Sequence, residues 1–371
     1  MKIIFMPMLP LTQRDYEQLG IKYFYEKNYE VTIIESHQLL MPHYKESVDI
    51  EYFNYQNTYE PSTEDELLST INNYTKNDYI FFYLASKEAV ILLNKMKKFT
   101  NAKFVTYISG SVPHTSSPCG ILNIAKSILR PVVKKLISKK FDSDIVFTGS
   151  PKDELIFPFL FGKNTKVIHT HSRDYELCLN VDGYNHDKEY CVFLDTDVID
   201  ASDYVIFGNK SDGNTDNYYK KLIDFFEFLQ DTMKIDVLIS AHPKSRIFKN
   251  TKNFKGFKVV HNSSPSLVKN SKFVISEGTT AISFAVYFDK PMIFFTMEEL
   301  RFFYKYTCSY AKQFKKNIFQ IDDLQILDID TLKNELNNTN EYDIFKYNYL
   351  TYKDESRNVF EKIERELLIG R

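Results

Sequence analysis

Short runs of apolar residues alternate along the chain with longer stretches that have the spacing of amphipathic helices. Continuous apolar runs rich in Val, Ile and aromatic residues are typical of strands that are buried on both faces of a parallel sheet. The predicted strands are 2–6, 30–35, 78–84, 103–109, 144–149, 190–195, 236–241, 257–261, 273–276 and 291–295. Because helical stretches separate most of them, the pattern predicts an α/β fold with helices covering the sheet.

The polar stretch at residues 180–189, "NVDGYNHDKE", has no apolar period and divides the pattern into two halves. We therefore expect two Rossmann-like domains, residues 1–183 and 184–345, that face each other across a cleft. Among the predicted helices are 14–27, 87–98, 216–233 and 280–289. The final segment, 346–371, also has helical spacing and is expected to pack back across the two domains.

Composition limits the classes of function. With 371 residues the chain is long enough for two domains, and 43% hydrophobic with 26% charged residues is ordinary for a soluble globular protein. A net charge of −2 offers no positive field for nucleic acid, so we expect no nucleic-acid partner. The four cysteines lack metal or CxxC spacing, and neither a signal peptide nor an apolar stretch of about 20 residues is visible. These features predict a cytoplasmic protein.

Two polar clusters follow predicted strands of the second half. "AHPKSR" places His242, Pro243 and Lys244 at the end of one strand, and "SEGTT", residues 276–280, follows another and opens a helix. A helix start leaves N–H groups without intrahelical partners and attracts anions. In a doubly wound sheet ligands bind at the carboxyl ends of the strands. The two clusters together predict a phosphate site, although hydroxyl residues before a helix also serve as ordinary N-caps.

The pair "AHPKSR" and "SEGTTAISFAVYFDKPMIFF" resembles the His-Pro and Ser/Thr motifs of bacterial GT-B glycosyltransferases that use CMP-activated sugars. That group includes the sialyl-, polysialyl- and Kdo-transferases of capsule and lipopolysaccharide assembly. The layout also resembles surface-carbohydrate biosynthesis proteins in which "RDYE…G" follows the first strand, as at residues 14–20 here. The resemblance implies a GT-B enzyme with a nucleotide-sugar donor and a glycan acceptor.

The resemblance also implies roles for individual residues. His242 would stabilise charge on the departing nucleotide, and Thr279 and Thr280 would grip its phosphate. The role of Glu277 stays open between a ribose hydroxyl, Lys244 and plain solvation. The full predicted donor set is Asp195, Pro243, Lys244, Ser276, Glu277, Gly278, Thr279 and Thr280.

A sugar hydroxyl is a weak nucleophile, so an inverting transferase needs a general base near the acceptor. Asp15, after the first strand, is one candidate, with capping of the following helix as its structural alternative. His114, in the loop "YISGSVPHTSSPCG", is the rival candidate. The acceptor side is expected to include Arg14, His171, Arg173 and Asp174.

Two further segments affect the predicted cofactors and partners. Asp195-Thr196-Asp197 has the form of the metal-binding DxD of GT-A transferases, but the helix-opening loop favours an enzyme without a metal or other cofactor. Residues 121–141 carry six Lys or Arg residues and no acid among apolar residues. A basic amphipathic helix of this kind can rest on the anionic inner face of a membrane.

The sequence thus predicts a GT-B glycosyltransferase that moves an acidic sugar, a nonulosonate or Kdo, from a CMP donor to a surface glycan or lipid-linked acceptor. Three alternatives stay open: a CDP-alditol phosphotransferase of the teichoic-acid type, a nucleotide-sugar 2-epimerase, and a non-catalytic nucleotide-sugar-binding scaffold.

Overall fold

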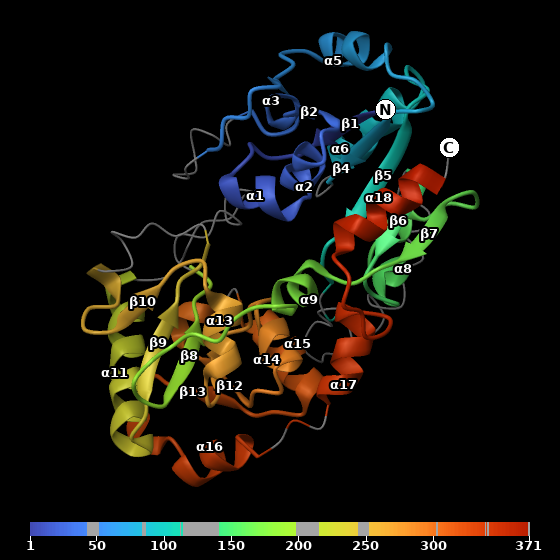
Figure 1. Ribbon diagram of the computed structural model, residues 1–371. Helices are drawn as coiled ribbons and strands as arrows, with labels where there is room; N and C mark the ends of the chain where they lie inside the picture. The colour runs from blue at the N-terminus through green and yellow to red at the C-terminus, as the bar shows by residue number, and fades with distance from the viewer. Residues whose placement is uncertain are drawn as a thin grey trace, which may run out of the picture. The chain divides into compact units, whose positions relative to one another are not determined.

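The chain is described by a computed structural model that covers residues 1–42, 52–83, 87–111, 113, 141–197, 215–243, 252–301, 303–337, 339 and 341–369. Its internal contacts divide these residues into two units (Figure 1). The first unit contains the described residues up to Ser111, those from 141 to Arg173, and those from Thr351 onward. The second contains those from Asp174 to Leu350, together with residue 113.

The first unit is built on a seven-stranded parallel sheet in the order β3-β2-β1-β4-β5-β6-β7. Its strands are β1 (Lys2–Met6), β2 (Glu30–Ile34), β3 (Thr58–Tyr59), β4 (Tyr79–Phe82), β5 (Lys103–Ile108), β6 (Ile145–Thr148) and β7 (Lys166–His169). Its helices include α1 (Gln13–Gln18), α2 (Ile21–Glu26), α3 (His37–Leu40), α5 (Glu64–Ile71), α6 (Lys87–Met96), α8 (Asp153–Ile156) and α18 (Val359–Ile369). The chain turns from β3 and β2 on one side of β1 to β4 on the other, so the sheet has a topological switch point beside β1.

The expected helix at residues 14–27 is divided in the structure into α1 and α2. Gly20 separates them with a φ of 88°, a left-handed conformation that glycine adopts without strain. A Cβ at this position would lie 2.6 Å from the ring of Phe360 in α18. The close approach of α18 therefore depends on the glycine.

Helix α18 is part of the core of the first unit. Val359, Phe360 and Ile363 are buried, and the hydroxyl of Tyr79 in β4 donates to the carbonyl of Leu367 at 2.9 Å. The segment 346–371 was expected to pack back across the two domains. In the structure the described residues from Thr351 onward belong to the first unit.

The second unit is built on a six-stranded parallel sheet in the order β10-β9-β8-β11-β12-β13. Its strands are β8 (Tyr190–Leu194), β9 (Asp236–Ser240), β10 (Lys258–Val260), β11 (Val274–Ser276), β12 (Met292–Thr296) and β13 (Ile318–Gln320). Its helices include α11 (Thr215–Met233), α13 (Ser264–Asn270), α14 (Ile282–Tyr287), α15 (Tyr304–Phe314), α16 (Ile329–Glu335) and α17 (Tyr342–Phe345). Here the switch point lies at β8, which pairs with β9 on one side and β11 on the other.

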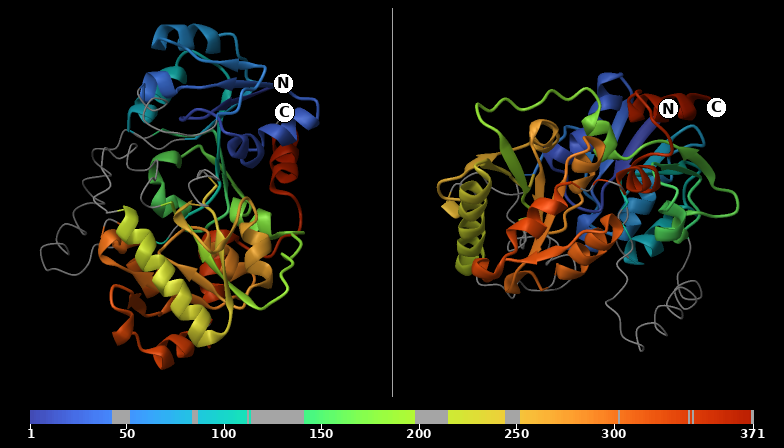
Figure 2. Two further views of the ribbon diagram at one scale, coloured as in Figure 1. Left: turned by 90° about the vertical axis from the view of Figure 1, so that its left-hand side faces the viewer. Right: turned by 90° about the horizontal axis from the view of Figure 1, so that it is seen from below.

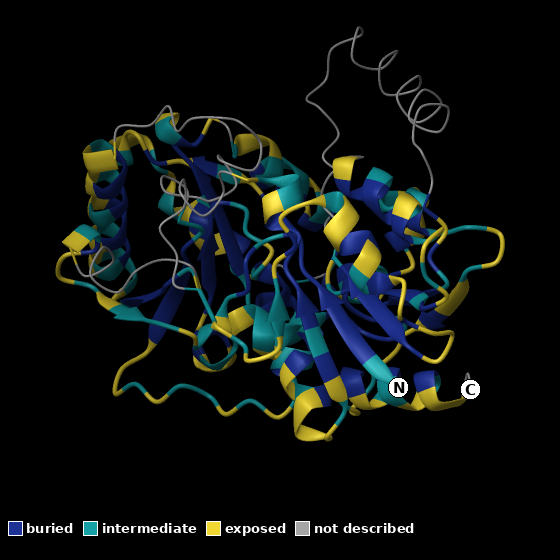
Figure 3. Cartoon of the chain, turned by 90° about the horizontal axis from the view of Figure 1, so that it is seen from above, coloured by how far each residue is buried: buried dark blue, intermediate teal, exposed yellow. Residues whose placement is uncertain are grey.

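Helix α11 lies against one face of this sheet (Figure 2), and aromatic side chains hold it there. The ring of Phe226 lies 5.1 Å from that of Phe193 in β8, and the ring of Phe225 lies 5.5 Å from that of Phe295 in β12. In both units the strands are largely buried, and the helices have an exposed outer side (Figure 3). The structure confirms the predicted α/β class with two Rossmann-like domains.

The structure differs from the sequence-based expectation in three strands, and it divides the chain at a definite position. Along the chain the division by internal contacts falls between Arg173 and Asp174, in α9 (Arg173–Cys178). Strands β3, β7 and β13 were not predicted, and each lies at the edge of a sheet. None of the helices in the described part of the chain is long and apolar enough to cross a membrane.

Candidate functional site

The carboxyl ends of β8, β9 and β11 bring the predicted donor residues to one edge of the second sheet. In the register of these strands, Leu194 lies opposite Ser240, and Phe193 lies opposite Ile275. The residues that follow the three strands therefore meet at the switch point. This is the place where open α/β sheets bind ligands.

Asp195 anchors the His-Pro loop at this edge. Its Oδ1 accepts the backbone N–H of Asp197 at 3.0 Å, and its Oδ2 accepts the backbone N–H of His242 at 3.4 Å. Only 6% of Asp195 is exposed, and this burial raises the pKa of its carboxyl to about 6. Asp195 thus fixes the backbone of the His-Pro step, while the His242 residue itself stays partly exposed.

Glu277 lies beside Asp195 in the interior of the same edge. Its Oε2 accepts the hydroxyl of Tyr218 from α11 at 2.9 Å, and its Oε1 accepts the hydroxyl of Thr196. Burial, and after it the nearby charge of Asp195, raises the pKa of Glu277 to about 8. The carboxyl group is therefore protonated at neutral pH, and its 1% exposure excludes the solvated carboxylate that the sequence left open.

The loop between β11 and α14 is a tight turn closed by its own side chains. The hydroxyl of Ser276 accepts the N–H groups of Gly278 at 3.0 Å and Thr279 at 3.4 Å. Gly278 has a φ of 108°, and a Cβ there would lie 2.8 Å from the backbone nitrogen of Thr307. The N–H groups of Gly278 and Thr279 are thus already used within the turn.

Past this turn, Thr279 and Thr280 reach the surface. Thr279 is partly exposed and its hydroxyl accepts the N–H of Ala281 at 3.3 Å, and Thr280 is exposed. Helix α14 begins two residues later, at Ile282. Any phosphate at this loop would meet mainly the hydroxyl groups of the two threonines.

Asp15 in the first unit caps its own helix. Its backbone N–H donates to the Thr12 hydroxyl at 3.2 Å, and its Oδ2 accepts the Thr12 N–H at 3.2 Å and hydroxyl at 2.6 Å. This capping box is the structural alternative raised by the sequence. Arg14 beside it is exposed.

A small hollow opens where the first sheet has its switch point, and the sequence analysis did not predict it. It is a shallow space of about 210 Å³, open solvent included. It is lined by residues of β1, α3, β4 and α6 and of the loops that follow β1, β2 and β4, among them Met6, Met8, Ser36, Phe82, Tyr83 and Leu92. Burial, and after it the charge of Asp15, raises the pKa of Tyr83. Asp15 therefore lies within electrostatic range of this hollow.

The other predicted acceptor residues, His171, Arg173 and Asp174, interact with neighbouring protein groups. His171 is fully buried, and its carbonyl accepts the hydroxyl of Tyr107 at 2.9 Å. The guanidinium of Arg173 lies over the ring of Phe360 at 5.7 Å. The charge of Asp174 adds to burial in raising the pKa of Cys178. His171 is therefore a core residue rather than part of an open face.

Some predicted residues lie outside the described part of the chain. These are His114, Lys244 and the basic stretch 121–140. The structure says nothing about the predicted general base at position 114 or about membrane contact through that stretch.

Comparison with known proteins identifies the fold. No protein-family model and no curated protein matches the sequence. Among solved structures, the chain is similar to UDP-GlcNAc 2-epimerase from Methanocaldococcus jannaschii in complex with UDP-GlcNAc and UDP, with a TM-score of 0.51, 15% identity and full coverage of both chains. It is equally similar to CalG4, the calicheamicin glycosyltransferase, with a TM-score of 0.51, 9% identity, and 100% of this chain and 98% of that chain covered. At these identities the likeness shows the GT-B type of fold.

Proposed function

We propose that the chain is a glycosyltransferase that uses a nucleotide-sugar donor bound at the carboxyl edge of the second sheet. The observation that carries this proposal is the cluster at the switch point. There, Asp195 holds the His242 backbone and Thr196 holds the Glu277 side chain, so the two predicted donor loops contact adjacent residues. Both a glycosyltransferase and a nucleotide-sugar epimerase share the fold, which supports a nucleotide-sugar ligand.

The protonation of Glu277 removes an objection to phosphate binding at this edge. An ionised carboxylate beside a phosphate would repel it, but a carboxyl group with a pKa of about 8 is neutral at pH 7. The hydroxyl groups of Thr279 and Thr280 and the imidazole of His242 are then the groups we assign to the leaving phosphate. They would stabilise the negative charge that develops on it.

In the proposed reaction an acceptor hydroxyl oxygen attacks the anomeric carbon of the donor sugar. The bond between that carbon and the phosphate oxygen breaks, and the nucleotide leaves with the electron pair. Asp15 is our proposed base for the acceptor proton, and it would exchange its hydrogen bond with the Thr12 hydroxyl for one with the acceptor. We propose a CMP-linked acidic sugar as the donor, because the His-Pro and Ser/Thr motifs resemble those of CMP-sugar transferases.

A 2-epimerase is the second candidate, because the chain is similar in fold to an epimerase that binds UDP-GlcNAc and UDP. A panel of CMP, CDP, UDP and GDP in a thermal-shift assay separates the two. A ligand at about 100 times its Kd adds roughly 2.7 kcal/mol of stability. Protection by CMP supports the sugar transferase, by CDP the alditol phosphotransferase, and by UDP the epimerase.

The variant His242→Gln tests the proposed site, and His186→Gln is its matched control. His186 pairs with Asp236, the first residue of β9, at the opposite edge of the same sheet, with 2.9 Å between Nε2 and Oδ2. We expect His242→Gln to lose most of the protection by the nucleotide and His186→Gln to keep it. Protection by UDP without protection by CMP would refute the CMP donor, and equal protection in both variants would refute the site.

A further inference from the structure

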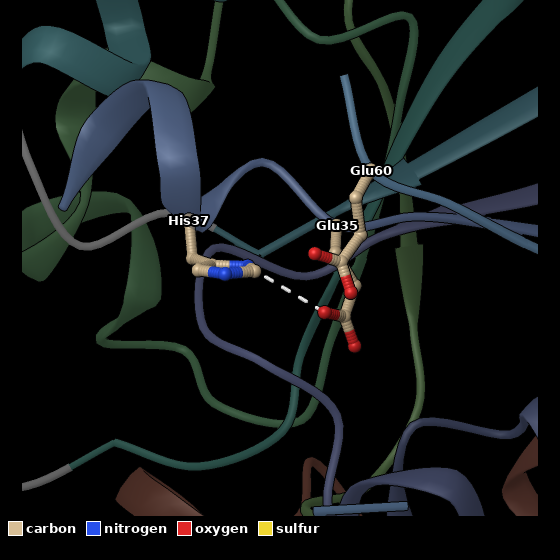
Figure 4. A group of neighbouring side chains, drawn as sticks. All are labelled: Glu35, His37 and Glu60. Carbon is tan, nitrogen blue, oxygen red and sulfur yellow. Dashed lines mark ion pairs between the residues drawn. The ribbon is translucent and has the colours of Figure 1, made fainter. Parts of the chain in front are cut away.

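Three side chains in the first unit, two carboxylates and one imidazole, gather around one point. Glu35 follows β2, His37 is the first residue of α3, and Glu60 follows β3. Their potential ligand atoms all lie within 4.8 Å of one another, and Figure 4 shows the side chains directed toward a common space. The pairing of β2 with β3, in which Ile34 lies opposite Tyr59, places Glu35 and Glu60 side by side.

The spacing of the two buried members matches that of ligands on one ion. Nδ1 of His37 lies 3.5 Å from Oε2 of Glu35. A charge-assisted hydrogen bond is shorter, at about 2.7–2.9 Å. Metal–ligand distances of about 2.0–2.2 Å in a tetrahedral site place neighbouring ligand atoms roughly 3.4 Å apart. The observed distance of 3.5 Å is therefore closer to the spacing of two ligands on one metal ion than to a charge-assisted hydrogen bond.

Outer hydrogen bonds hold the carboxylates in position. Oε1 of Glu35 accepts the backbone N–H of Leu11 at 2.8 Å, and Oε2 of Glu60 accepts the amide of Gln38 at 3.4 Å. Such outer partners are typical of metal ligands, because they orient the ligand and fix which oxygen faces the ion. Glu35 and His37 are 4% and 1% exposed, so these two residues would hold an ion largely away from solvent.

We propose that Glu35, His37 and Glu60 bind a divalent transition-metal ion, with zinc as the preferred ion. An imidazole together with carboxylates suits zinc better than magnesium or calcium, which prefer oxygen ligands alone. Three protein ligands leave a tetrahedral ion one position for water. The ion joins the ends of β2 and β3 beside the hollow, which Ser36 lines. The site contains none of the predicted donor residues.

The test is zinc binding by chelator-treated full-length protein, measured by isothermal titration and by metal content after dialysis. We expect one zinc bound through this site, not displaced by a tenfold excess of magnesium. Glu60→Gln should weaken binding at least tenfold, because even the loss of an outer partner costs a metal site about 10- to 100-fold. His37→Gln should also lose binding.

Glu17→Gln is the matched control. Glu17 is an exposed glutamate of the same unit that, like Glu60, accepts a glutamine amide, from Gln13 at 2.8 Å. We expect it to bind zinc as the wild type does. If His37→Gln does not fold, Glu60→Gln decides the matter, since Glu60 is exposed and circular dichroism can verify its fold. Wild-type protein that retains no zinc, or a Glu60→Gln variant with unchanged affinity, would overturn the proposal.

Discussion

The protonation of Glu277 predicts an unusual dependence of stability on pH. Its pKa is raised from 4.5 to about 8, chiefly by burial, so the folded state holds a proton that the unfolded state releases between those values. Stability from this group is complete below pH 4.5 and is lost as the pH rises toward 8. Replacement of Glu277 by Gln removes the titrating group and keeps an oxygen to accept the hydroxyl of Tyr218.

The size of the effect follows from linkage. One extra proton in the folded state changes the free energy of unfolding by about 1.36 kcal/mol per pH unit. Between pH 6 and 8 Glu277 therefore lowers the stability by roughly 2.3 kcal/mol, because the folded state has already lost half of this proton at pH 8. Asp195, with a pKa raised from 3.8 to about 6, adds a similar slope only below pH 6. The interval from pH 6 to 8 thus isolates Glu277 from Asp195.

Urea unfolding at pH 6, 7 and 8, followed by circular dichroism, measures the effect. Histidines also titrate in this interval, so the quantity to compare is the difference between variant and wild type. We expect the wild type to lose about 2–3 kcal/mol more than Glu277→Gln from pH 6 to 8. Glu227→Gln, an exposed change on the same helix as Tyr218, should follow the wild type. Parallel pH profiles for Glu277→Gln and wild type would refute the protonated carboxyl group.

Three further changes test the packing around these features by urea unfolding. Gly278→Ala should lower the free energy of unfolding by about 2–4 kcal/mol, because the residue has a left-handed φ and the added Cβ would clash with the backbone of residue 307. Gly256→Ala is the control, with a φ of 92° and no described atom within 4 Å of the added Cβ, and it should cost only about 1 kcal/mol. Equal costs for the two variants would exclude the clash. Tyr218→Phe should cost about 1–3 kcal/mol, because it leaves the buried oxygen of Glu277 without that donor, and an unchanged midpoint would contradict this contact. Glu364→Gln should weaken the hydrogen bonds that the hydroxyls of Tyr23 and Tyr29 donate to residue 364, both at 2.6 Å. The raised pKa of Tyr23 should then move closer to its ordinary value in a spectroscopic titration. An unchanged tyrosine titration would show that burial alone raises the pKa of Tyr23.

The interior strands could be predicted because burial on both faces makes their sequences continuously apolar. β1 and β8, with neighbours on both sides, coincide with the predicted runs almost residue for residue. β3, β7 and β13 lie at sheet edges, and each has partly or fully exposed residues. Their short, half-polar sequences give no apolar run, which is why the sequence did not reveal them.

The meeting of the two predicted donor loops could be predicted from topology alone, because parallel strands place their carboxyl ends at one edge. The partner of Glu277 could not be predicted in this way. Tyr218 has the helical spacing of an ordinary core residue, and only the packing of α11 on the sheet brings its hydroxyl to the carboxyl group. The proposed metal site could not be predicted from the sequence for a similar reason. Glu60 follows β3, a strand that the sequence pattern did not predict.

The chemistry of the second unit's edge follows from what is buried there. Burial raises the pKa of Asp195 to about 6, and burial together with the charge of Asp195 raises the pKa of Glu277 to about 8. At neutral pH the pair carries about one negative charge instead of two, on Asp195, whose two oxygens already accept backbone N–H groups. The proposed phosphate would therefore meet the hydroxyl groups of the two threonines and the imidazole of His242, with the charge of Asp195 but not that of Glu277 behind them. As the pH rises past 8 the second charge appears, and the proposed nucleotide binding at this edge should weaken for the same reason that the fold does.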